Sequence, residues 1–92
     1  ESLLPGEFEL SSVHPNPFNP TTNIEFVVPD NMHISVAIFD ISGREINRLQ
    51  DGIMESGYHS ISWNASYVSS GVYFLKIVAG NEIYSRKLML VK

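Results

Sequence analysis

The sequence predicts an all-β fold in which six or seven mainly antiparallel strands form a two-sheet sandwich. Apolar and polar residues alternate with a period of two in several short stretches, which is the pattern of half-buried strands. Clusters of Gly, Pro, Asn, Asp and Ser separate these stretches, and no long helical pattern interrupts them. Because one face of each stretch is apolar, we expect two sheets that bury these faces against each other.

Three strands are predicted in the first half of the chain. A short one covers residues 8–13. The second covers residues 23–28, where Ile, Phe and Val alternate with their neighbours until the Pro-Asp-Asn turn at 29–31. The third covers residues 34–39 and leads to the tight Ser-Gly turn at 42–43, where glycine can take a positive φ without steric cost.

The segment after this turn is less regular. Ile46 and Leu49 are three residues apart, a spacing that fits either a helical turn or a bulged strand. The short length of the segment and its flanking turns favour a strand. We expect Asp51-Gly52 to form the turn that ends it.

The second half of the chain predicts three more strands. Residues 58–63 place His59, Ile61 and Trp63 on one side, with Trp63 as an anchor of the core. Residues 72–79 are the most β-prone stretch, and Gly80-Asn81 is a two-residue hairpin signal. The closing strand, residues 83–91, has an ambiguous register, because both of its faces carry apolar residues. Ile83, Met89 and Val91 share one face, and Tyr84, Leu88 and Leu90 share the other.

Length and composition limit the possible functions. The 92 residues suffice for one domain, and a net charge of −4 without a basic cluster argues against nucleic acid as a partner. The absence of cysteine excludes disulfides and thiolate chemistry. No apolar run reaches the roughly 20 residues of an integral membrane segment. We expect residues 1–7 to be a linker remnant, marked by Pro5-Gly6, and residues 8–92 to be the domain.

The sequence offers no sign of a catalytic or metal site. His14, His33 and His59 lie in different turns and strands, and none has a carboxylate at the spacing of a metal site or a triad. We therefore predict a protein that is not an enzyme and has no cofactor. A sugar-binding surface would need several tyrosines on one exposed face, whereas alternating aromatic residues are more often buried. The tyrosines in question are Tyr58, Tyr67, Tyr73 and Tyr84.

Four segments carry more information than the rest. The first is an Asn-Pro loop in which Asn16 and Asn19 can bond neighbouring backbone N–H groups, while Phe18 plugs the end of the sandwich. In the second, Asp40 is expected to cap its turn and to pair with Arg44. The third is the block around Trp63. The fourth joins residues 70–74 to the terminus at 87–92, whose lysines frame an apolar strand that a partner could extend. The predicted structural loop consists of Asn16, Pro17, Phe18, Asn19 and Pro20.

In this order and at this spacing, these segments resemble the type A C-terminal sorting domains of the type IX (Por) secretion system of Bacteroidetes and related bacteria. The resemblance covers about residues 8–92. His14 departs from the family, which more often has Tyr there, although both side chains offer a flat ring. The matching blocks are HPNPFNPTTNI, IFDISGRE, SGYHSISWNA, SSGVYFLKIVAG and RKLMLVK.

The resemblance implies an immunoglobulin-like sandwich that follows a cargo domain in a protein exported through the periplasm and outer membrane, to the cell surface or the medium. It implies recognition by the outer-membrane translocon and, as for many members of the family, contact with a sortase-like peptidase that removes the domain; the sequence leaves open whether this domain is cleaved or retained. The alternative is a structural, carbohydrate-binding or protein-binding accessory module of a secreted protein, because related flagellar-hook-cap-type modules share much of the pattern. The recognition residues implied by the family's terminal motifs are Gly71, Val72, Tyr73, Lys87, Leu88, Met89, Leu90, Val91 and Lys92.

Overall fold

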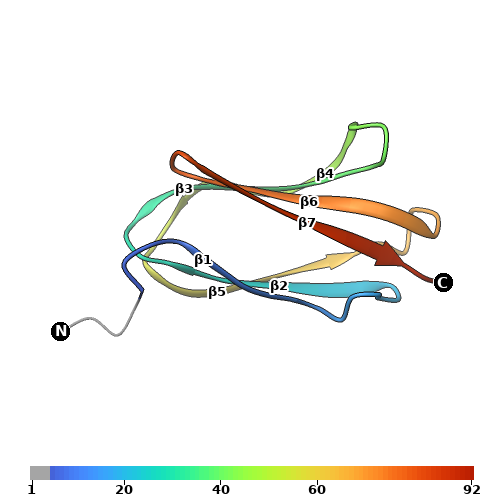
Figure 1. Cartoon of the computed structure of the whole chain (residues 1–92), viewed down its shortest axis with the longest axis horizontal. Helices are drawn as coiled ribbons and strands as arrows, with labels where there is room; N and C mark the ends of the chain where they lie inside the picture. The colour runs from blue at the N-terminus through green and yellow to red at the C-terminus, as the bar shows by residue number, and fades with distance from the viewer. Residues whose placement is uncertain (1–4) are drawn as a thin grey trace.

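A computed structural model describes residues 5–92, which form seven strands in two sheets packed face to face (Figure 1). One sheet has the strand order β1-β2-β5, and the other has the order β4-β3-β6-β7. The predicted all-β sandwich is confirmed. The strands are β1 (Glu9–His14), β2 (Thr21–Val28), β3 (Met32–Phe39), β4 (Glu45–Met54), β5 (Gly57–Asn64), β6 (Gly71–Ala79) and β7 (Glu82–Leu90).

The topology is immunoglobulin-like, with one strand moved between the sheets. Every pair of neighbouring strands is antiparallel. In a constant-type immunoglobulin domain the fourth strand lies beside the fifth. Here β4 lies beside β3 instead, so the second sheet has four strands, with β4 and β7 at its two edges.

The core lies between the sheets and follows the alternation of the sequence. In β3, Ile34, Val36 and Ile38 face inward and are fully buried, as predicted. Trp63, the predicted anchor, is 1% exposed. Burying side chains of this size stabilises the fold by about 1.5–3 kcal/mol each. The largest of the other buried residues are Ile24, Phe26, Val28, Leu75, Ile77, Leu88 and Leu90.

Strand β4 is bulged, as one of the two interpretations of its spacing predicts. Its register against β3 shifts twice, so Ile46 and Leu49 have no opposing residue in the ladder. Both side chains therefore reach the core although they are three residues apart. The predicted turn at Asp51-Gly52 is wrong, because β3 provides pairing partners for both residues and β4 continues to Met54.

The β6–β7 hairpin resolves the ambiguous register of the closing strand. Gly80 has a φ of +61°, which suits the first central residue of a type II′ turn. The resulting ladder sets Leu88 opposite the buried Tyr73 and Leu90 opposite Gly71, so both leucines face the core. Ile83, Met89 and Val91 are consequently exposed.

The turns gather at two opposite ends of the sandwich (Figure 1). One end holds the start of β1 and the β6–β7 turn. We call the other the C-terminal end, and it comprises residues 15–20, 40–44, 65–73 and 87–92. Of the predicted linker, residues 1–4 lie outside the described residues. The described chain contains no helix long and apolar enough to cross a lipid bilayer.

Candidate functional site at the C-terminal end

Parts of the segments singled out in the sequence converge at this end, although Asn16 and its partners in β7 are 71 and 73 residues apart. Residues 71–73 pair directly with residues 88–90 across the β6–β7 ladder. The loop at 15–20 lies along β7, and a cleft of about 360 Å³ separates the 40–44 turn from residues 68–73. The fold therefore brings segments that are far apart in the sequence together in one surface.

The Asn-Pro loop is fastened to β7 by the side chain of Asn16. Its Nδ2 donates to the Lys87 carbonyl at 2.8 Å, and its Oδ1 accepts from the Met89 N–H at 3.0 Å. The prediction that Asn16 and Asn19 bond neighbouring backbone is therefore wrong for Asn16, whose partners lie 71 and 73 residues away. A side-chain amide has the same donor and acceptor as a peptide group, so it can replace one in a ladder. For Asn19, the described structure records no side-chain hydrogen bond.

Phe18 continues this contact along the strand. Its N–H donates to the Met89 carbonyl at 2.9 Å, and its carbonyl accepts from the Val91 N–H at 3.0 Å. Its ring is 2% exposed, with its centroid 5.5 Å from that of Trp63. The prediction that Phe18 plugs the end of the sandwich is confirmed.

These contacts change what β7 offers to a partner. The strand does lie at the edge of its sheet, as expected. Residues 16–18 nevertheless occupy the outer backbone groups of residues 87–91, so this part of the edge is already paired. The expectation of an open edge along the whole strand is therefore corrected. Within the described chain, the uncovered part of the edge is residues 82–86.

Tyr73 and Gly71 have structural tasks in this arrangement. Tyr73 is 7% exposed, and its hydroxyl donates to the Ser69 carbonyl at 2.6 Å. A tyrosine near the start of the sixth strand with this bond is the tyrosine corner of immunoglobulin-like sandwiches. Gly71 has a φ of +151°, a backbone conformation that residues with a side chain rarely adopt. Both residues fix the path of the chain into β6.

The Asp40 turn is built as predicted. The Asp40 carboxylate accepts from the Ser42 hydroxyl at 2.6 Å and from the N–H groups of Ser42 and Arg44 at 2.9 and 3.0 Å. These hydrogen bonds, led by the Ser42 hydroxyl, hold the pKa of Asp40 below its usual value. Arg44 also pairs with the carboxylate at 3.2 Å, but its side chain is 78% exposed, so the pair itself adds little stability.

Lys92 ties the end of the chain to the β5–β6 loop. Its backbone N–H donates to the Ser70 hydroxyl at 3.1 Å. Its ammonium group donates to the Ser66 carbonyl at 2.9 Å and to the Val68 carbonyl. The Lys92 ammonium group thus provides a hydrogen-bond donor to two carbonyl groups that converge at this end.

The nine predicted recognition residues fall into two groups in the structure. The side chains of Tyr73, Leu88 and Leu90 are buried, and Gly71 has none. A partner that docks on the folded domain can therefore contact side chains of the other group only. The members of that group are Val72, Lys87, Met89, Val91 and Lys92.

Phe74 lies within the fourth segment of the sequence analysis but is not among the predicted recognition residues. Phe74 is 39% exposed and lies on the outward face of β6, directly opposite Lys87. The alternation of the strand could have identified it. Successive side chains point to opposite faces, so Phe74 must point outward if Tyr73 and Leu75 point inward.

The alternative kinds of site find little support. The two most exposed tyrosines do not form one stacking platform, because Tyr58 lies at the start of β5 and Tyr67 follows the end of the same strand. Tyr67 instead accepts hydrogen bonds from Asn47 and Trp63. Within residues 5–92, no three His, Cys, Asp or Glu side chains meet as a metal site.

The chain matches a known protein family. Residues 12–92 match the model of a family described as secretion system C-terminal sorting domain (Por_Secre_tail). The matched region contains the loop at 15–20 and every strand from β2 to β7. No curated protein matches the chain.

Proposed function

The chain belongs to the family of C-terminal sorting domains of the type IX secretion system, and from this premise we propose that its C-terminal end is the surface that the outer-membrane translocon recognises. Membership of this family makes the chain a sorting signal for a protein exported to the cell surface or the medium. The translocon recognises the folded sandwich and not an extended peptide.

One observation carries this proposal. Each segment through which the sequence resembles the family has part of its length at one end of the sandwich, away from the end where the chain enters β1 (Figure 1). A cargo joined ahead of β1 through residues 1–7 would emerge from the opposite end. The signal would then remain accessible beside a folded cargo, and a sortase-like peptidase could cut the linker without reaching the signal.

The translocon reads side chains and not an open strand edge at residues 87–91. Strand addition needs free backbone N–H and C=O groups, and residues 16–18 occupy them on this segment. Displacing residues 16–18 would expose Phe18, and losing a buried phenylalanine from a core costs roughly 3–5 kcal/mol. The exposed group around Met89 and Val91 is available without that cost.

The test is export of a passenger protein fused ahead of residues 1–92 in a bacterium that carries the type IX system. We expect the fusion in the medium or on the cell surface, and the unfused passenger in the periplasm. Deleting residues 87–92 is a poor test, because it removes the buried Leu88 and Leu90 and therefore the fold. Retention of the intact, folded fusion in the periplasm would contradict the proposed function.

A further inference from the structure

Charge is unevenly distributed along this chain. Nine of its ten acidic residues precede Ser56, and Glu82 is the only one that follows. Four of its six basic residues lie after Ser56: Lys76, Arg86, Lys87 and Lys92. An acidic protein therefore contains one basic hairpin, formed by β6 and β7.

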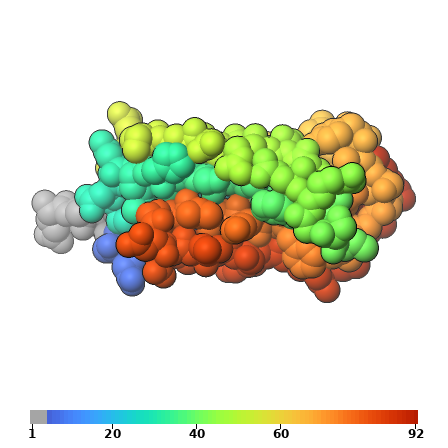
Figure 2. Space-filling model, turned by 90° about the horizontal axis from the view of Figure 1, so that it is seen from above, coloured from blue at the N-terminus to red at the C-terminus, as the bar shows by residue number. Residues whose placement is uncertain are grey.

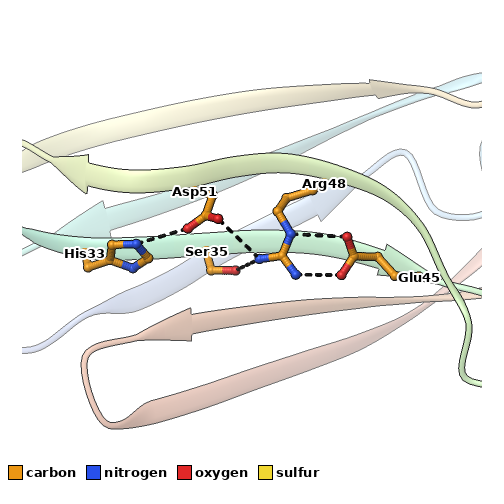
Figure 3. A network of polar contacts seen from close by, with 5 residues as sticks. All are labelled: His33, Ser35, Glu45, Arg48 and Asp51. Carbon is orange, nitrogen blue, oxygen red and sulfur yellow. Dashed lines mark hydrogen bonds and ion pairs between the residues drawn. The ribbon is translucent and has the colours of Figure 1, made fainter.

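The outer face of the four-stranded sheet divides along the same line. Figure 2 looks onto this face, with β4 in yellow-green along one side and β6 and β7 in orange and red along the other. On the β4 side, oppositely charged side chains pair with one another. Arg48 donates to both carboxylate oxygens of Glu45 at 2.6 and 3.1 Å and to the Ser35 hydroxyl at 2.8 Å (Figure 3). Asp51 lies 3.8 Å from Arg48 and 3.0 Å from the imidazole of His33.

The β6–β7 side of this face has charges without partners. Lys76 and Lys87 are exposed, and the structure records no ion pair for either among residues 5–92. Lys76 lies 5.8 Å from the ring centroid of Phe39. Glu82 does not share this side, because it stands opposite the inward-facing Ala79.

Apolar side chains surround these two lysines. Phe74 lies opposite Lys87 in the ladder, and Val72 lies opposite Met89. Phe74, Met89 and Ile83 are 39%, 41% and 62% exposed, so this side carries three of the large exposed hydrophobic residues of the described chain. We call this surface the outer hairpin face, and it consists of Val72, Phe74, Lys76, Ile83, Lys87 and Met89.

We propose that the outer hairpin face docks on an acidic protein surface of the export machinery, with carboxylates opposite Lys76 and Lys87 and apolar side chains opposite Phe74 and Met89. This inference rests on the proposed function and extends the recognition surface from the C-terminal end along β6 and β7. Exposed Phe and Met are typical of the centres of protein interfaces, whereas lysine is depleted there. Two unpaired lysines on such a surface therefore require complementary charge.

The chemistry of this face favours a protein over a lipid surface. Anionic membranes attract clusters of about four to eight basic residues. The outer hairpin face has only Lys76 and Lys87, because Arg86 stands opposite the buried Leu75 and so belongs to the other face of β7. A sheet face that combines two lysines with exposed apolar side chains matches another protein surface better.

Arg86 supplies a matched control for the test. It adjoins Lys87 in the same strand, is exposed and carries the same charge. Three fusions are compared with the wild type in the passenger export assay: Lys87→Glu, Lys76→Glu combined with Lys87→Glu, and Arg86→Glu. Thermal unfolding of each isolated domain, followed by circular dichroism, identifies variants that fail to fold.

We expect the double variant to lower export at least about tenfold, since it places two carboxylates against an acidic surface, and Lys87→Glu to lower it less. Arg86→Glu should export like the wild type. Equal export of all folded variants, or an equal loss with Arg86→Glu, would overturn the inference while leaving the proposed function intact. A wild-type fusion that is not exported would instead refute the proposed function.

Two further measurements test the alternative partners of this face, a membrane and a second copy of the chain. Flotation with vesicles that contain anionic phospholipid tests a membrane, and analytical ultracentrifugation tests a second copy of the chain. We expect the wild-type domain to remain free of vesicles and monomeric. Vesicle binding or dimerisation that Lys76→Glu with Lys87→Glu abolishes, and Arg86→Glu does not, would contradict an acidic protein partner.

Discussion

The side-chain amide of Asn16 takes the place of a neighbouring strand beside Met89. Its Oδ1 accepts a hydrogen bond from the Met89 N–H at 3.0 Å. The same amide donates to the Lys87 carbonyl, and the backbone of Phe18 continues the pairing. A loop near the start of the domain thus covers the edge of its last strand. Uncovered edges are sites of unwanted pairing between chains, so this contact has consequences for both stability and association.

Replacing Asn16 with alanine should destabilise the domain and uncover that edge. The loss of two hydrogen bonds lowers the free energy of unfolding by about 1–2 kcal/mol, which urea denaturation measures. We also expect concentration-dependent association in sedimentation velocity. Asn19→Ala, in the same loop, is the matched control and should change neither. Identical behaviour of the two variants would show that the Asn16 contact is unimportant.

Shortening Phe18 to alanine should be far more damaging. The ring is 2% exposed and lies beside Trp63, so its removal leaves a cavity and costs roughly 3–5 kcal/mol. Phe18→Leu keeps most of the volume and should cost less than about 1.5 kcal/mol. Urea denaturation followed by Trp63 fluorescence compares them. A loss below 1 kcal/mol in the alanine variant, roughly the value of a single surface contact, would contradict the role of Phe18 as a plug.

Removing the hydroxyl of Tyr73 tests the tyrosine corner. Tyr73→Phe keeps the buried ring but leaves the Ser69 carbonyl without its donor at 2.6 Å. We expect a loss of about 1–2 kcal/mol in the free energy of unfolding. Tyr58→Phe, at an exposed position, controls for the change of residue and should be neutral. If both variants unfold at the same denaturant concentration as the wild type, the corner contributes nothing.

The Asp40 turn should make stability depend on pH in the acidic range. Hydrogen bonds hold the pKa of Asp40 in the folded protein below its value in the unfolded chain, led by the bond from the Ser42 hydroxyl. The stabilisation is therefore fully present above the unfolded pKa, near 4, and is lost as pH falls through the folded pKa. Asp40→Asn should lower stability at neutral pH, and its difference from the wild type should shrink as the pH becomes more acidic.

Thermal unfolding between about pH 2 and 7 measures this dependence. Asp30→Asn removes the same charge from the turn between β2 and β3 and serves as the control. A difference between Asp40→Asn and the wild type that stays constant over this range would show that the Asp40 carboxylate does not stabilise the turn.

The sequence was sufficient for most of the fold because local signals agree with the tertiary structure. Alternation in β2 and β3, the Gly80-Asn81 turn and the Asp40 cap all act within a few residues, and the structure has each of them. The turn predicted at Asp51-Gly52 was wrong. These residues favour turns, but pairing with β3 outweighs that local preference. A tertiary partner can override a local preference of this kind.

The site was less predictable, because its contacts are long-range. Nothing near Asn16 in the sequence indicates that its amide partners lie in β7. The closing strand has apolar residues on both faces, so only pairing with β6 determines that Leu88 turns inward and Met89 outward. The family motifs therefore mark buried and exposed residues alike, and the structure is needed to separate them.

The central claim is that the folded C-terminal end and the adjoining face of the β6–β7 hairpin, and not the β4 side of the sandwich, carry the export signal. The most direct measurement compares export of fusions that carry Met89→Asp or Ile53→Asp. Met89 and Ile53 are 41% and 69% exposed, and they lie toward opposite ends of the four-stranded sheet. We predict that Met89→Asp leaves the folded fusion in the periplasm, whereas Ile53→Asp is exported like the wild type. Equal export of the two folded variants would contradict the claim.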